Sequence, residues 1–110
     1  MWVVEVSTEE ISLKKETAIE KITKTSRELP EFHVKALYIF GSVARDEAEN
    51  TSDVDILVEF TPEARIGLFR FLQLKNFLEG ILGCSVDLVT ADGLHPMMRD
   101  SILEERIRVA

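Results

Sequence analysis

Three aspartates, Asp53, Asp55 and Asp87, could hold divalent cations. Asp53 and Asp55 stand two residues apart at the start of a predicted strand, so their carboxylates should lie on the same face of a sheet. Two carboxylates about 4 Å apart repel by ~4 kcal/mol at an effective dielectric constant of about 20, and a bound cation would relieve that repulsion. Oxygen ligands with room for water and phosphate oxygens favour Mg²⁺ or Mn²⁺. Asp87, inside the apolar segment Val86–Val89, would join the pair if its strand lay alongside, and three carboxylates can hold two metal ions.

A glycine and a serine precede these aspartates. Gly41 and Ser42 follow a predicted strand, and ten residues (43–52) separate Ser42 from Asp53. A strand that ends in Gly-Ser and turns directly into a helix would present backbone N–H groups and a hydroxyl to triphosphate oxygens. Glycine allows close approach of the ligand because it has no Cβ. Arg45, one turn into the helix, could also reach phosphate, although a solvated surface charge would look the same in sequence.

Each of these features is weak when taken alone. Asp-x-Asp is common in surface turns, Gly-Ser before a helix is usually a cap, and an acid within a strand usually faces solvent. Their combination in this order is much more specific and indicates a nucleotide- and metal-dependent site. His33 and His95 lack the neighbouring residues of a triad or zinc site, and Cys84 lies in an apolar run, so we interpret all three as structural.

The elements that must position these residues alternate between helix and strand. Apolar periodicity and turn residues predict four helices: from a cap at Ser7 to Leu29, over 42–49 with Ser42 as N-cap, over 61–82 and from 95 onward. They predict strands over 34–40, 54–60 and 84–90. Gly80 and Gly83 are expected to end the third helix. The connection between the first two strands is only about a dozen residues, near the lower limit for a parallel crossover. We therefore expect an α/β (α+β) fold with a mixed three-stranded sheet flanked by about four helices.

Size and charge limit the classes of protein to consider. The chain has 110 residues, which we interpret as a single domain over 1–110, with an N-terminal helical segment (1–30) and a core (34–110). The net charge of −7 disfavours direct nucleic-acid binding, because phosphate backbones are held mainly by Lys and Arg. The single cysteine gives no sign of an oxidising compartment, and no segment has the length of a membrane span or signal peptide. We expect a cytoplasmic protein without membrane association.

Three segments together resemble the minimal nucleotidyltransferase family of the DNA-polymerase-β-like superfamily. The resemblance runs from about Leu37 to the end of the chain and is carried by Gly41–Arg45, Ser52–Val58 and Val86–Val89. It implies the family's nucleotidyltransferase fold, with ATP as substrate and two Mg²⁺ ions as cofactors. It also implies metal-binding and catalytic roles for the three aspartates and phosphate binding by the Gly-Ser pair.

The resemblance further implies a biological role. Many members are encoded beside HEPN-domain toxins, and some transfer AMP to a tyrosine of the toxin, so we expect an enzyme: a protein adenylyltransferase that acts as an antitoxin in a hetero-oligomer. Two alternatives stay open, an antitoxin that acts by binding alone and a transferase for a small molecule or an RNA end. The latter is weaker, because such relatives usually carry a second domain for the acceptor. The apolar positions of the helix over 64–82 exceed what a three-stranded sheet can cover, which favours a partner surface there.

Overall fold

The structure is a computed structural model that describes residues 15–45 and 53–110. The helix start expected at Ser7 and the second half of the helix expected over 42–49 lie outside these residues. The described elements, in chain order, are α2 (Lys15–Lys24), the 3₁₀ helix η1 (Leu29–Phe32), β1 (Val34–Phe40), α3 (Gly41–Ala44), β2 (Val54–Phe60), α4 (Leu68–Leu82), β3 (Val86–Thr90), the 3₁₀ helix η2 (Ala91–Gly93), α5 (Pro96–Glu105) and β4 (Ile107–Arg108).

The strands form one mixed sheet in the order β3-β2-β1-β4. Strand β1 is antiparallel to β2 and to β4, whereas β2 and β3 are parallel. The predicted α/β class and mixed sheet are confirmed, but the sheet has four strands where three were expected. The fourth, β4, is only two residues long, and it pairs Arg108 with Tyr38 and Ile107 with Ile39. Polar and apolar residues do alternate from Arg106 to Val109, but a run of four residues is at the lower limit of a strand pattern, and the sequence analysis did not identify it.

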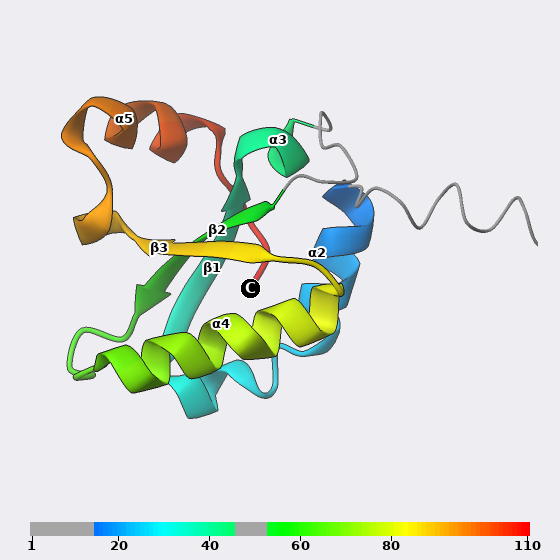
Figure 1. Ribbon diagram of the computed structural model, residues 1–110, viewed down its shortest axis with the longest axis vertical. Coiled ribbons are helices and arrows are strands. Elements are labelled where there is room, and N and C mark those ends of the chain that lie inside the picture. Colours follow the sequence, from blue (N-terminus) through cyan, green and yellow to red (C-terminus); the bar gives the residue numbers. More distant parts are fainter. Residues whose placement is uncertain (1–14, 46–52) are drawn as a thin grey trace, which may run out of the picture.

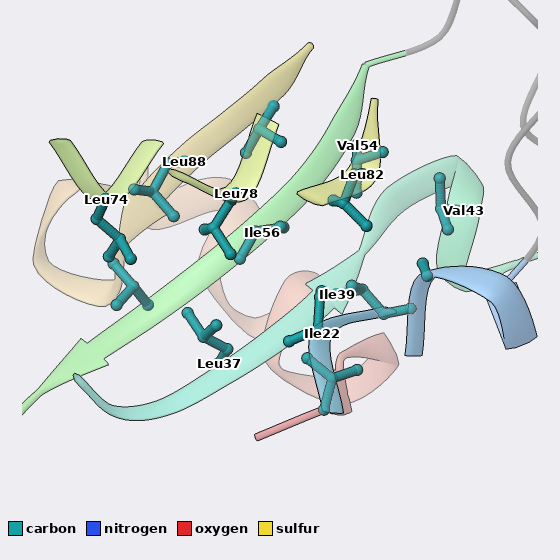
Figure 2. Close-up of a cluster of buried hydrophobic side chains, with 14 of the residues drawn as sticks. Ile22, Leu37, Ile39, Val43, Val54, Ile56, Leu74, Leu78, Leu82 and Leu88 are labelled. Atoms are coloured by element: carbon teal, nitrogen blue, oxygen red, sulfur yellow. The ribbon is translucent and has the colours of Figure 1, made fainter. Parts of the chain in front are cut away.

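Helices cover both faces of this sheet (Figure 1), with α2 and α4 on one side and α5 on the other. Strand β2 is buried on both faces because Val54, Ile56 and Val58 point to the α2–α4 side while Leu57 points toward α5. Figure 2 shows the larger core, in which side chains of α2 and α4 meet those of the strands. Its fully buried members include Ile22, Leu37, Ile39, Ile56, Leu74 and Leu78.

The smaller apolar cluster lies under α5. It contains Phe40 from the end of β1, Leu57 from β2 and Ile102 from α5. Side chains alternate along a strand, so Asp55 lies on the same face as Leu57. The packing of Ile102 on this face therefore holds α5 beside the aspartates.

Helices α2 and α3 differ from their predicted bounds. Helix α2 ends at Lys24 and not at Leu29, because tight turns follow it in which Thr25 donates from both its backbone and its hydroxyl to Ile22 O. Leu29, the predicted end of this helix, and Pro30 after it lie in η1. Helix α3 begins at Gly41 with Phe40 as its N-cap residue, so the prediction of Ser42 as N-cap was wrong.

The remaining differences concern the crossover from β2 to β3. Helix α4 begins at Leu68 and not at Thr61, because a turn follows β2 in which Thr61 N donates to His33 O and Ala64 N donates to Thr61 O. Gly80 lies inside the helix, and Gly83 alone ends it, with a left-handed φ of 73°. Strand β3 begins at Val86, two residues later than expected. Among the described residues, no helix is long and apolar enough to cross a membrane.

Candidate active site

Asp55 and Asp87 are neighbours across two parallel strands. The register of β2 and β3 pairs Asp55 with Asp87 directly, so their side chains project from the same face of the sheet. Asp55 is half-buried and Asp87 is exposed. This is the face covered by α5, and both carboxylates line a pocket of about 520 Å³.

The environment of Asp55 disfavours its negative charge. Burial, the charges of Asp87 and Asp53, and a hydrogen bond with Asp87 raise the pKa of Asp55 from 3.8 to about 6, while the positive charge of Arg45 works in the opposite direction. At neutral pH the Asp55 carboxylate therefore carries its charge at an energetic cost. A cation placed between the carboxylates would remove much of this cost, which is the electrostatic condition for a metal site.

Asp53 stands just before β2 and is exposed. It is close enough to Asp55 for its charge to help raise the pKa of that carboxyl. Within 15–45 and 53–110, however, no three His, Cys, Asp or Glu side chains already form a group that could hold a metal ion. The structure thus brings Asp55 and Asp87 together, and the participation of Asp53 stays a prediction.

Gly41 lies directly against Asp55. Its φ of +72° is in the left-handed region, and a Cβ built on it would overlap the Asp55 Oδ2 atom. Any side chain at position 41 would therefore be both strained and in collision with a predicted metal ligand. Position 41 therefore requires glycine because the backbone at the start of α3 lies directly against the Asp55 side chain of β2. Ser42 follows it in the first turn of α3.

Arg45 is linked to α5 through Glu105, a residue that the sequence analysis did not identify. Arg45 Nη1 donates to Glu105 Oε1 and Oε2, each at 3.2 Å. Gly41 N also donates to Glu105 Oε1, at 3.2 Å. Glu105 lies 60 residues after Arg45 and is one of 20 acids in the chain, so only the packing of α5 reveals the connection.

The pocket has a charged part and an apolar rim. The charged part holds Arg45, Asp55, Asp87 and Glu105, and the apolar part comes from Phe40, Ile102, Met97 and Met98. The two methionines are unusual because their side chains are largely open to solvent, with Met97 87% exposed. Large exposed apolar side chains beside a charged pocket indicate contact with a ligand or partner.

The two histidines and the cysteine have no place in this pocket. His95 is the N-cap of α5, where its Nδ1 accepts a hydrogen bond from Met97 N at 3.2 Å. His33 ends η1 with a left-handed backbone. Cys84 is half-buried, and burial raises the pKa of its thiol, which disfavours the reactive thiolate. None of the three lines the pocket that contains Asp55 and Asp87.

Comparison with known proteins identifies the family. The family model for the nucleotidyltransferase domain matches residues 19–109. Protein adenylyltransferase MntA of Thermococcus cleftensis is 40% identical over 89 residues, which cover 80% of this chain and 88% of that protein. A solved structure of a proposed minimal nucleotidyltransferase has 36% identity and a TM-score of 0.71, covering 86% of this chain and 95% of the other.

A more distant solved structure shares the fold. It is a complex of a tri-AMPylated Shewanella oneidensis HEPN toxin with an MNT antitoxin; the matched chain has 19% identity and a TM-score of 0.60, with coverage of 87% of this chain and 71% of that one. The similarity in fold agrees with the sequence match, which covers residues 19–109. The protein therefore belongs to the nucleotidyltransferase family.

Proposed function

We propose that this nucleotidyltransferase moves AMP from ATP onto a tyrosine hydroxyl of a HEPN-domain toxin and acts as its antitoxin. The observation that carries the proposal is the pairing of Asp55 with Asp87 in a pocket that also contains Gly41 and Arg45. Similarity to a protein adenylyltransferase over most of both chains supports protein as the acceptor. The fold shared with a complex of an antitoxin and an AMPylated HEPN toxin supports the class of partner.

The triphosphate would lie along the segment from Gly41 to Arg45. The space that a Cβ of Gly41 would take is filled by Asp55 Oδ2, so phosphate oxygens bound to this backbone segment would lie directly beside the Asp55 carboxylate. The Ser42 hydroxyl and backbone N–H groups of this segment would donate to those oxygens. The Arg45 guanidinium, which lines the same pocket, would neutralise part of the charge of the β- and γ-phosphates.

The donor set fits Mg²⁺, a hard cation that prefers oxygen ligands. Two carboxylates face one another, and their proximity and partial burial keep the pKa of Asp55 near 6, so a divalent ion would find a negative, poorly compensated site. Asp55 and Asp87 would hold the metal, joined by Asp53. When bound, Mg²⁺ would neutralise triphosphate charge and favour ionisation of the acceptor hydroxyl.

The transfer itself is a single displacement at the α-phosphorus. The acceptor oxygen forms a bond to this phosphorus while the bond to the oxygen bridging to the β-phosphate breaks, and pyrophosphate leaves with that electron pair. The hydroxyl proton passes to one of the paired carboxylates, Asp55 or Asp87, and from there to water. The role of the protein is to hold the acceptor and the α-phosphate in line, and the rigid strands β2 and β3 suit that role.

The acceptor must come from a partner with its own surface. Met97 and Met98, exposed at the pocket rim, could receive an aromatic acceptor side chain, because thioether sulfur makes favourable contacts with aromatic rings. A second apolar surface, at the start of α4, consists of Leu68, Phe69 and Leu72, of which the first two are each 74% exposed. This surface lies on the helix for which a partner contact was expected from sequence. Because α4 packs on the opposite face of the sheet from α5, it could hold a partner independently of catalysis.

The proposal is tested by incubating the chain with a HEPN-domain protein and with ATP and Mg²⁺. Intact mass spectrometry of the HEPN protein should show a gain of one or more AMP units, located on a tyrosine by peptide mapping. The Asp55→Asn variant should give no gain, whereas Asp100→Asn, which removes an exposed acid of α5, should behave as wild type. A stable complex without AMP transfer would instead favour an antitoxin that acts by binding alone. If the two proteins form no complex and no AMP is transferred, the antitoxin role is refuted.

A further inference from the structure

The last residue of α5 places a carboxylate where the nucleotide is proposed to bind. Glu105 accepts hydrogen bonds from Gly41 N and from Arg45 Nη1, each at 3.2 Å. Its side chain is 29% exposed, and it lines the same pocket as Asp55 and Asp87. Both donors belong to the segment assigned above to the triphosphate. An anion of the protein itself therefore holds the groups that would hold an anionic substrate.

We infer that Glu105 competes with the nucleotide phosphates for Gly41 and Arg45 and thereby sets the affinity of the site for ATP. This inference rests on the proposed nucleotide site. A backbone N–H that donates to a carboxylate cannot donate with full strength to a phosphate oxygen at the same time. A carboxylate left within about 4 Å of a phosphate would also repel it by roughly 1–4 kcal/mol, depending on the local dielectric constant. Nucleotide entry should therefore move the Glu105 carboxylate away from Gly41.

The competing explanation is that Glu105 only clamps α5 to α3. The two explanations predict different results when the charge is removed. A clamp would make the protein less stable without improving nucleotide binding. A competing anion would make nucleotide binding tighter, because the Glu105 charge would no longer hold Gly41 N and Arg45 Nη1 and its repulsion of the phosphates would disappear.

The test compares Glu105→Gln with Glu104→Gln. Glutamine keeps the size of the side chain but lacks its charge, and Glu104 is the exposed neighbour on the same helix. Dissociation constants for ATP with Mg²⁺ and for inorganic tripolyphosphate are measured by isothermal titration calorimetry. Glu105→Gln should bind both ligands about tenfold more tightly than wild type, the change expected for one relieved charge contact in a partly open pocket. Glu104→Gln should stay within about twofold, because solvent and salt screen an exposed charge.

Arg45→Ala adds a second measure of the same competition. If Glu105 engages Arg45 in the free protein, the arginine is less available to phosphate, so Arg45→Ala should weaken ATP binding more in the Glu105→Gln background than in wild type. Equal losses in the two backgrounds would contradict competition for Arg45.

Unchanged or weaker ATP binding by a folded Glu105→Gln variant would refute the inference, and if that variant also melts at a lower temperature, Glu105 acts only as the clamp. If wild type and both glutamine variants bind neither ATP nor tripolyphosphate, the proposed nucleotide site itself fails, and the inference with it. Should Glu105→Gln not fold, ¹³C NMR of the wild-type carboxyl carbons decides: tripolyphosphate should shift the Glu105 signal, and an unmoved signal would refute displacement.

Discussion

Replacing Asp55 with asparagine should stabilise the metal-free protein at neutral pH. The pKa of Asp55 is raised from 3.8 to about 6, chiefly by burial and by the charges of Asp87 and Asp53. The folded state therefore holds the Asp55 proton more tightly than the unfolded state does. Between about pH 4 and pH 6 the folded state binds more protons than the unfolded state. The free energy of unfolding therefore falls as the pH rises through this window. Above about pH 7 Asp55 is charged in both states, and the folded state bears the full free-energy cost of that half-buried charge.

The size of the effect follows from the pKa difference. At about 1.36 kcal/mol per pKa unit, the rise to about 6 corresponds to roughly 3 kcal/mol. Asp55 is only half-buried, and screening by water and salt reduces the realistic gain from Asp55→Asn to about 1–2 kcal/mol. A domain of about 100 residues gains about 4–8 °C in melting temperature per kcal/mol, so the variant should melt roughly 4–16 °C higher at pH 7.5.

The assay is urea and thermal denaturation from pH 4 to pH 8 with a chelator present. The difference between Asp55→Asn and wild type should be near zero at pH 4, grow through pH 6 and become constant above pH 7. Asp100→Asn, an exposed acid of α5, should show no such growth. Addition of Mg²⁺ at pH 7.5 should stabilise wild type and not Asp55→Asn, because a ligand of the folded state raises its stability. A variant less stable than wild type at pH 7.5 would refute the reasoning and assign Asp55 a structural role.

Three further substitutions test the site, the core and the partner surface. Gly41→Ala should cost about 1–3 kcal/mol of stability and abolish ATP binding, because its Cβ would overlap Asp55 Oδ2 at a left-handed φ; urea denaturation and calorimetry measure both, and normal ATP binding would place the nucleotide elsewhere. Leu78→Ala should lower the free energy of unfolding by about 2–5 kcal/mol in urea denaturation, since Leu78 is fully buried, and a loss below about 1 kcal/mol would contradict its place in the core. Phe69→Ser should change stability by less than about 0.5 kcal/mol yet weaken the complex with the HEPN protein in a titration; unchanged affinity would exclude the start of α4 as the contact.

The strands and their chemistry were accessible from sequence because both depend on short-range patterns. The predicted bounds of β1 and β2 agree with the structure, since apolar runs with clear ends define buried strands. The fixed spacing of Asp53 and Asp55, and the position of Asp87 in a later strand, were enough to expect adjacent acids. The structure pairs Asp55 with Asp87 as that reasoning required.

The parts that sequence did not predict depend on long-range packing. Helix α4 begins at Leu68 because the segment after β2 first turns beside His33, a contact between residues 28 positions apart. Strand β4 forms only because β1 offers an open edge to the end of the chain. Glu105 lies in the site because Ile102 of the same helix, α5, packs on Phe40 and Leu57 of the sheet. Local periodicity does not specify which distant segments pack against one another.

The register of the sheet explains how so small a fold can assemble this site. Phe40 pairs with Asp55 across β1 and β2, and Asp55 pairs with Asp87 across β2 and β3, so the proposed phosphate segment and both acids lie at one level of the sheet. The antiparallel pairing of β1 and β2 is essential here, because it brings the end of one strand, where Gly41 follows, beside the start of the next. A slip of one residue in β2 would turn Asp55 into the apolar core and Ile56 out of it. The burial of Ile56 and Leu57 on opposite faces therefore fixes the register, and the register in turn fixes the contact between Gly41 and Asp55.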